Sequence, residues 1–228
     1  RRFHHPSIHN FRLYLQGGPL SPMLANLYFR RFLLAWKRFG YERQLKALVV
    51  NYADDLVICC RPGKGREAMD AFRLLMTRLG LTVNETKTQM VRVPEESFDF
   101  LGYTIGRLYA WHGRPYIGIT PSKKAVRKVR RKIHEATSRR WDCQLPHERV
   151  SKINEILRGW SGYFNHGHIK PTHQLVWRYT EVRLRRWLMR RGKCYGTGYK
   201  RYPRSYLYKT LGLYPKPTHR TAVQNAKA

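Results

Sequence analysis

The chain has 228 residues, with 45 lysines and arginines against 14 aspartates and glutamates, and it carries a formal net charge of +31. This positive charge is larger than solubility requires and indicates a polyanionic partner. The 6 tryptophans and 15 tyrosines favour RNA or DNA over a membrane surface, because aromatic rings stack on bases while cations meet phosphates. The alternative is a basic structural protein, like those of ribosomes, with no chemistry of its own.

The cysteines and the N-terminal sequence indicate in which cellular compartment the protein works. The cysteines (Cys59, Cys60, Cys143 and Cys194) show no C-x-x-C spacing, so we expect buried residues in a reducing compartment, not a zinc site or disulfides. Neither a bilayer-spanning apolar stretch nor a signal peptide is visible. The chain opens on Arg1 and not on Met, so we expect an N-terminally truncated fragment.

The charge is unevenly distributed along the chain. Residues 1–120 carry a net charge of +9, whereas residues 121–228 carry +22. Hydrophobic residues make up 42% of the chain, which is enough for a packed core. We therefore expect a mixed α and β domain over 1–120, a strongly basic helical domain over 121–216, and a flexible tail over 217–228.

A glycine-rich turn precedes the first expected helix. Its residues are Gln16, Gly17, Gly18 and Pro19, and its glycines permit a close approach of backbone to a ligand. The spacing of apolar residues then predicts a helix over residues 22–39. A plain turn into a helix is the alternative for the glycine pair.

Two adjacent carboxylates, Asp54 and Asp55, follow in the next pattern. Apolar, β-branched flanks at 45–50 and 56–60 predict a hairpin, with Asn51 and both aspartates in its turn. Unpaired carboxylates near a core require a cation or hydrogen bonds. A divalent-metal site and a solvated acidic turn are equally compatible with this stretch alone.

The remaining pattern predicts both strands and helices. After a helix over 67–79 we expect a strand over 88–93 and a hairpin whose arms are 98–105 and 114–120, turning at Trp111–Gly113. Beyond it, helical periodicity recurs over 121–140, 147–165 and 172–191. We assign Trp160, Tyr163, Trp177 and Trp187 to the core of these helices.

The order of these motifs resembles the reverse transcriptases encoded by group II introns, also called maturases. Residues 16–28 resemble the family's fourth conserved block, Tyr52–Asp55 the metal-binding turn of the fifth, and 80–88 the sixth. Phe100–Tyr103 resembles the seventh. The basic helical domain resembles the thumb, or domain X, through the Arg158-Gly159-Trp160 and Tyr206–Tyr214 segments. Each motif is moderately specific, but their order is highly specific.

The resemblance implies an α+β fold, with a partial polymerase palm (an antiparallel sheet with helices) followed by an all-α basic thumb. It departs from the family at Leu15, where proline is usual, and in lacking the finger blocks and the third catalytic aspartate. This fragment alone is therefore expected to be inactive as a polymerase.

The resemblance also implies the chemistry and the partners. Asp54 and Asp55 would be catalytic residues that bind Mg²⁺ for two-metal nucleotidyl transfer. The expected partners are intron RNA, an RNA template–DNA primer duplex and dNTPs, in a bacterial cytoplasm. The expected nucleotide- and template-binding residues are Gln16, Gly17, Gly18, Pro19, Tyr52, Ala53 and Lys87. The expected RNA-binding residues are Lys123, Lys124, Arg127, Lys128, Arg130, Arg131 and Lys132.

Several alternatives stay open. A surface salt bridge is the alternative for Lys87. The whole chain could instead be a non-catalytic RNA-binding splicing cofactor, or another bacterial reverse transcriptase of the retron, diversity-generating or CRISPR-linked kind.

Overall fold

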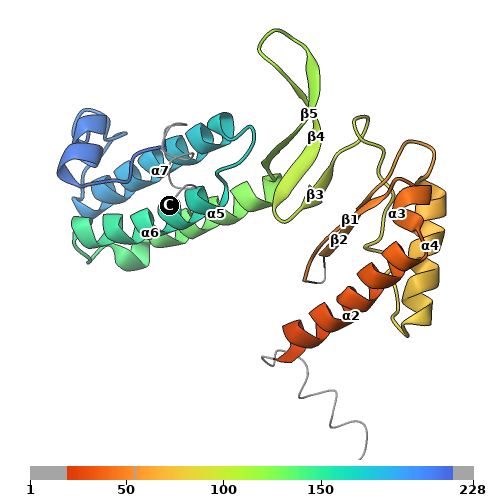
Figure 1. Cartoon of the computed structure of the whole chain (residues 1–228). Coiled ribbons are helices and arrows are strands. Elements are labelled where there is room, and N and C mark those ends of the chain that lie inside the picture. The colour runs from red at the N-terminus through yellow and green to blue at the C-terminus, as the bar shows by residue number, and fades with distance from the viewer. Residues whose placement is uncertain (1–19, 54, 218–228) are drawn as a thin grey trace, which may run out of the picture. The chain divides into compact units, whose positions relative to one another are not determined.

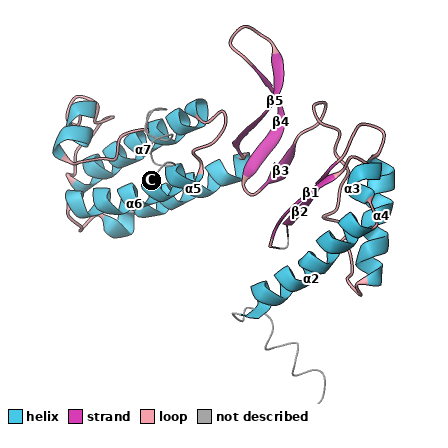
Figure 2. Ribbon diagram, in the orientation of Figure 1, coloured by secondary structure: helices cyan, strands magenta, loops and turns pink. Residues whose placement is uncertain are grey.

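The computed structural model describes residues 20–53 and 55–217 and divides the chain into two compact units, Arg1–Arg92 and Val93–Ala228. Each unit has its own buried apolar cluster. Helices and antiparallel strands occur in both units (Figures 1 and 2), which confirms the α+β class. The unit boundary groups the strands after residue 92 with the basic helices, whereas our domain boundary at 120 rests on charge and stays a prediction.

The first unit packs helices beside a two-stranded sheet. Its elements are α2 (Leu20–Arg38), α3 (Tyr41–Gln44), β1 (Leu48–Tyr52), β2 (Asp55–Cys59) and α4 (Gly65–Arg78). The helices predicted over 22–39 and 67–79 are confirmed. Phe32 of α2 meets Phe72 of α4 edge to face, with ring centroids 5.7 Å apart, and Trp36 Nε1 donates a hydrogen bond to the Ala47 carbonyl at 3.3 Å. These contacts fix the start of β1 against the helices.

The strand predicted over 88–93 is wrong. Among the described residues of the first unit the sheet contains only β1 and β2, and residues 88–92 form no strand. The segment instead lies along α4: the Met90 side chain covers Gly65 so closely that an added Cβ would meet its sulfur at 2.7 Å. Arg73 of α4 also donates to both carboxylate oxygens of Glu85, at 3.1 and 2.7 Å. Alternating valines favour a strand only where a partner strand is in reach.

The second unit begins with a three-stranded antiparallel sheet, in the order β3 (Phe98–Phe100), β4 (Tyr103–Tyr109) and β5 (Pro115–Pro121). The hairpin predicted across residues 111–113 is confirmed. However, the single arm predicted over 98–105 is wrong. Leu101 and Gly102 have φ values of 48° and 78° and form a two-residue turn that pairs Phe100 with Tyr103.

Three helices follow the sheet: α5 (Lys123–Ala136), α6 (Pro146–Tyr163) and α7 (Lys170–Arg191). They confirm the predicted helical region, although α5 ends before residue 140. Thr137 terminates it by folding its hydroxyl onto the Ile133 carbonyl at 2.8 Å. A 3₁₀ turn, η1 (Arg139–Trp141), follows α5, and a π turn, η2 (Tyr206–Thr210), lies in the segment after α7.

The core of the second unit partly follows expectation. Trp177 and Trp187 are buried and Trp160 packs against the cluster, as predicted. Tyr163 is 55% exposed, so its assignment to the core is wrong. None of the cysteines is buried: Cys59 and Cys143 are exposed, and Cys60 and Cys194 are half-buried. The expected tail over 217–228 lies, apart from residue 217, outside the described residues.

No helix within residues 20–53 and 55–217 combines the length and the apolar character needed to cross a bilayer.

Candidate metal-binding hairpin and basic surface

The β1–β2 hairpin has a tighter turn than predicted. Tyr52 pairs directly with Asp55, so only Ala53 and residue 54 lie between the strands. Ala53 has a φ of 52°, the left-handed conformation that two-residue hairpin loops of this kind require. Asn51 and Asp55 therefore belong to the strands and not to the turn. Asp54 itself lies outside the described residues.

Asp55 and Tyr52 lie side by side on one face of the hairpin. Residues directly opposite in an antiparallel pair have Cβ atoms only about 5 Å apart. Both side chains are exposed, Tyr52 by 65%. This pairing places a tyrosine ring beside a carboxylate that is free to bind a cation or a hydrogen-bond donor.

The described residues of the hairpin supply part of a possible magnesium site. Carboxylate oxygens such as those of Asp55 suit Mg²⁺. In the described part of the chain, no three His, Cys, Asp or Glu residues lie close enough together to hold a metal. Asp55 therefore fits as one ligand, with the neighbouring Asp54 as the second ligand that the sequence predicts.

The remaining predicted nucleotide- and template-binding residues are only partly described. Gln16, Gly17, Gly18 and Pro19 lie outside the described residues. Lys87 is exposed in a turn where its backbone N–H donates to the Asn84 carbonyl at 3.1 Å. No ion pair between described residues includes Lys87, so its cation is open to solvent.

Helix α5 presents the strongly basic face that its sequence predicts. Ser122 caps it by accepting a hydrogen bond from the Ala125 N–H at 3.1 Å. Val129, Ile133 and Ala136 are buried in the core. This orients the other face to solvent. The cations exposed there are Lys123, Lys124, Arg127, Lys128, Arg130, Arg131 and Lys132.

Two of these cations have neighbours. Arg131 Nε lies 3.8 Å from a Glu135 carboxylate oxygen, and the Arg130 guanidinium lies over the Tyr179 ring at 4.4 Å. Their solvent exposure keeps both contacts weak. The α5 face is thus a run of cations with little internal neutralisation, as a phosphate-binding surface requires.

Sequence reasoning missed a buried ionic cluster on α7. Glu181 is only 7% exposed, and it accepts hydrogen bonds from Tyr208 Oη at 2.8 Å and Arg204 Nε at 2.9 Å. Arg185 Nη2 lies 3.6 Å from its second oxygen. Burial, followed by the bond to Glu181, raises the pKa of Tyr208 to about 12. The cluster fixes the segment after α7 to the helix; the one available signal was the i,i+4 spacing of Glu181 and Arg185.

Two family models match the chain. The model of the reverse transcriptase (RNA-dependent DNA polymerase) family matches residues 7–105, which include the β1–β2 hairpin and the Leu101–Gly102 turn. The model of the group II intron maturase-specific domain matches residues 126–206, from α5 into η2. A comparison with curated proteins found no match. Because the two matches follow in order and together cover most of the chain, the chain belongs to the family of group II intron reverse transcriptases with a maturase-specific domain.

Proposed function

We propose that this protein is the RNA-directed DNA polymerase of a group II intron and that it also binds the intron RNA to assist splicing and mobility. The observation that carries the catalytic part is the β1–β2 turn. It fixes Asp55 beside Tyr52 at the end of the hairpin. The other acidic residue of the pair, Asp54, directly precedes Asp55 in the sequence. The match to the reverse transcriptase family supports this assignment.

Asp54 and Asp55 would hold the divalent ions. Bound Mg²⁺ would stabilise the attacking and leaving oxygens of nucleotidyl transfer. Tyr52 and Ala53 border the incoming nucleotide or the primer end in this proposal, and Lys87 meets a phosphate. Gln16, Gly17, Gly18 and Pro19 would line the nucleotide and template. Completing a two-metal site takes at least one further oxygen ligand beyond the two aspartates.

Primer extension tests the catalytic proposal. In the full-length natural protein, Asp54→Asn and Asp55→Asn should each reduce extension by about 1000-fold or more, because the ions contribute several kcal/mol to transition-state stabilisation. RNA affinity should stay within about twofold, since neither residue belongs to the basic surface. The matched control is Asp70→Asn, an exposed carboxylate on α4. Extension retained in both hairpin variants would disprove the assignment.

Metal binding can be measured apart from activity. Mn²⁺, whose paramagnetism allows direct titration by electron paramagnetic resonance, should bind the wild-type protein and the Asp70→Asn variant. The hairpin variants should bind it more weakly, because each removes a carboxylate ligand. Equal binding by all of them would place the metal elsewhere.

The intron assignment rests on the thumb. A match to the maturase-specific domain favours the intron class over retron, diversity-generating and CRISPR-linked enzymes. The exposed cations of α5 support intron RNA and the template–primer duplex as ligands. The free cysteines, two of them exposed, agree with the reducing cytoplasm of a bacterium.

A non-catalytic splicing cofactor is the second candidate, supported by the match to the group II intron maturase-specific domain. The primer-extension assay separates the two, because a cofactor would bind intron RNA and promote splicing with no extension that depends on Asp55.

A further inference from the structure

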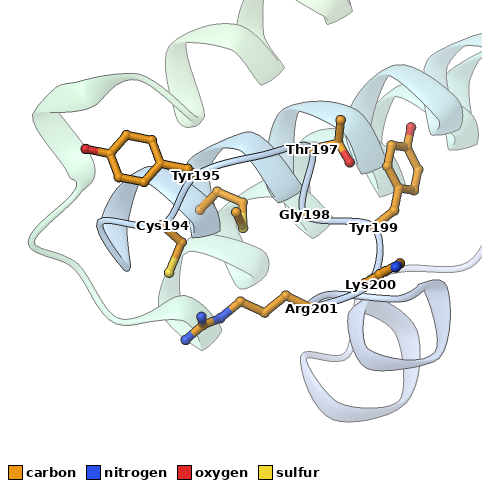
Figure 3. Close-up of a pocket in the computed structure, with 8 residues that line it drawn as sticks. Cys194, Tyr195, Thr197, Gly198, Tyr199, Lys200 and Arg201 are labelled. Atoms are coloured by element: carbon orange, nitrogen blue, oxygen red, sulfur yellow. The ribbon is translucent and has the colours of Figure 1, made fainter.

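A second surface rich in tyrosines and cations lies at the end of α7. We call residues 193–204 the tyrosine loop. Figure 3 shows a pocket of about 440 Å³ that is lined by part of this loop. The Tyr195 and Tyr199 rings lie at opposite ends of the segment drawn, and the Arg201 side chain extends beneath it toward Cys194. The α5 basic face does not include any of these residues.

The loop is held in a defined conformation. The Cys194 N–H donates to the Met189 carbonyl at 2.9 Å, and the Tyr202 N–H donates to the Gly198 carbonyl at 2.8 Å. Gly198 has a φ of 77° and packs on the Met189 side chain, where an added Cβ would lie 2.7 Å from Cγ. A surface held in this way loses little conformational entropy when a ligand binds.

The Tyr199 ring is held in place by a buried arginine. The Arg185 guanidinium lies over the Tyr199 ring, 4.5 Å from its centroid. Arg185 is only 3% exposed and is fixed by Glu181 and by the Tyr202 carbonyl, which accepts from its Nε at 3.0 Å. Since Tyr199 is itself 55% exposed, part of its ring stays open to solvent while Arg185 holds it in place.

The other ring has no such support. Tyr195 is fully exposed, at 100%. Exposing a large aromatic side chain completely is unfavourable in water. The whole face of the Tyr195 ring is therefore available for stacking against a planar group of a partner.

The electrostatics select an anionic partner. Lys193, Lys200 and Arg201 are exposed, and none of them takes part in an ion pair between described residues. No aspartate or glutamate follows Glu181 in the whole sequence. Cations therefore flank both rings with no nearby carboxylate in the loop to repel phosphates.

We propose that the tyrosine loop binds unpaired nucleotides of a single-stranded nucleic acid. Bases would stack on Tyr195 and Tyr199 while Lys193, Lys200 and Arg201 contact phosphates. A duplex offers its phosphates but hides its base faces, so the rings select single strands. Helix α7 begins close to β5, because the His168 N–H just before it donates to the Ile119 carbonyl. Its 22 residues span about 33 Å, and the tyrosine loop lies beyond its far end. This site is therefore separate from the three-stranded sheet and goes beyond the polymerase and α5 functions.

Binding of short oligoadenylates to the full chain tests the proposal. Tyr195→Ala should weaken binding of the single strand about fivefold or more, because each stacked base contributes appreciably to affinity. Tyr195→Phe, which retains a stacking ring, should bind within about twofold of wild type. Affinity for an RNA duplex should not change in either variant. Since the Tyr195 ring is fully exposed, its removal leaves the folded core intact.

The salt dependence separates stacking from charge. The slope of log affinity against log salt should be unchanged in Tyr195→Ala and should fall by about 1.4 in Lys200→Gln/Arg201→Gln, at about 0.7 for each phosphate contact to a single strand. Ribose and deoxyribose strands are compared to detect any contribution of the 2′-hydroxyl; binding of either supports the site.

The matched control is Tyr109→Ala, which removes a tyrosine that is 62% exposed on β4. An equal loss of affinity in this control, or in duplex binding by Tyr195→Ala, would overturn the proposal. So would single-strand affinity that Tyr195→Ala leaves unchanged.

Discussion

Tyr103 and Tyr163 lie side by side, and the hydroxyl of each donates a hydrogen bond to a backbone carbonyl of the opposite segment. Tyr103 Oη donates to the Tyr163 carbonyl at 2.8 Å, and Tyr163 Oη donates to the Leu101 carbonyl at 2.9 Å. Their rings stack at 28° with centroids 6.2 Å apart. Burial raises the pKa of Tyr103, so its hydroxyl remains protonated and able to donate. The pair ties the Leu101–Gly102 turn to the end of α6.

Removing either hydroxyl should destabilise the second unit. Tyr163→Phe and Tyr103→Phe should each lower the free energy of unfolding by about 1 kcal/mol, the usual contribution of one hydrogen bond. The double variant should lose less stability than the sum of the two single losses, because both bonds hold the same turn against the end of α6. Urea unfolding measures these values. Tyr109→Phe, which removes the hydroxyl of an exposed tyrosine, should stay within about 0.5 kcal/mol of wild type. Additive losses in the Tyr103/Tyr163 double variant would argue against coupling between the two bonds.

The Tyr103–Tyr163 contact also shows what the sequence could not reveal. Its partners lie 60 residues apart, and no local pattern joins them. The sequence marked Tyr163 as apolar helix core, whereas the structure uses its hydroxyl at the surface. The Leu101–Gly102 turn was missed for a related reason: leucine rarely adopts positive φ, so nothing but Gly102 signalled the break.

Elements set by local periodicity were predictable. The buried face of α5, with Val129, Ile133 and Ala136, follows directly from the spacing of its apolar residues. The hairpin carrying Asp55 was found from its β-branched flanks, although not its two-residue turn. Segment 88–93 failed because strand formation depends on a partner, which a single sequence does not provide.

The conformation of Ala53 leads to a second prediction. Its φ of 52° costs an L-residue roughly 1 kcal/mol and costs glycine almost nothing. Ala53→Gly should therefore retain the hairpin and primer extension. Ala53→Val, which is β-branched, should lower extension by about tenfold or more and destabilise the turn by about 1–2 kcal/mol. Full activity in the valine variant would show that the left-handed turn is dispensable; inactivity of the glycine variant would assign a role to the methyl group.

His173 should make the stability of the second unit depend on pH. Its Nε2 lies 2.8 Å from the Phe164 carbonyl, and because a carbonyl only accepts, Nε2 carries the proton of the neutral ring. The ring lies between Trp160 and Trp177, at 5.1 and 5.6 Å. Burial lowers the pKa of His173 below its ordinary 6.5, and the charge of Lys216 lowers it further, against the opposing effect of the Phe164 bond.

The sign follows from the lowered pKa. The unfolded chain takes up the proton more readily, so the stabilising contribution is complete above about pH 6.5 and is lost as the pH falls through the folded-state pKa. The free energy of unfolding should decrease there by at most about 1.4 kcal/mol per pH unit for one proton. His173→Gln should flatten this dependence, whereas His147→Gln, at an exposed position of α6, should preserve it. An unchanged profile in His173→Gln would assign the titration to another group.

The basic face of α5 gives the last prediction. Lys124 and Lys128 are exposed and unpaired among the described residues, at i,i+4 spacing on one helix. If both meet phosphates, Lys124→Gln/Lys128→Gln should lower the slope of log affinity for structured RNA against log salt by about 1.4–1.8.

A matched control removes the same charge from sites already neutralised. Lys64 and Lys152 each lie 2.6 Å from a carboxylate oxygen, of Glu67 and Glu155. Lys64→Gln/Lys152→Gln should leave the slope nearly unchanged, although the net charge falls equally. A slope that falls alike in both double variants would mean that total charge, and not the α5 face, determines RNA affinity. A slope that falls only in the α5 variant would place phosphates against that helix, because counterion release counts contacts and not charges.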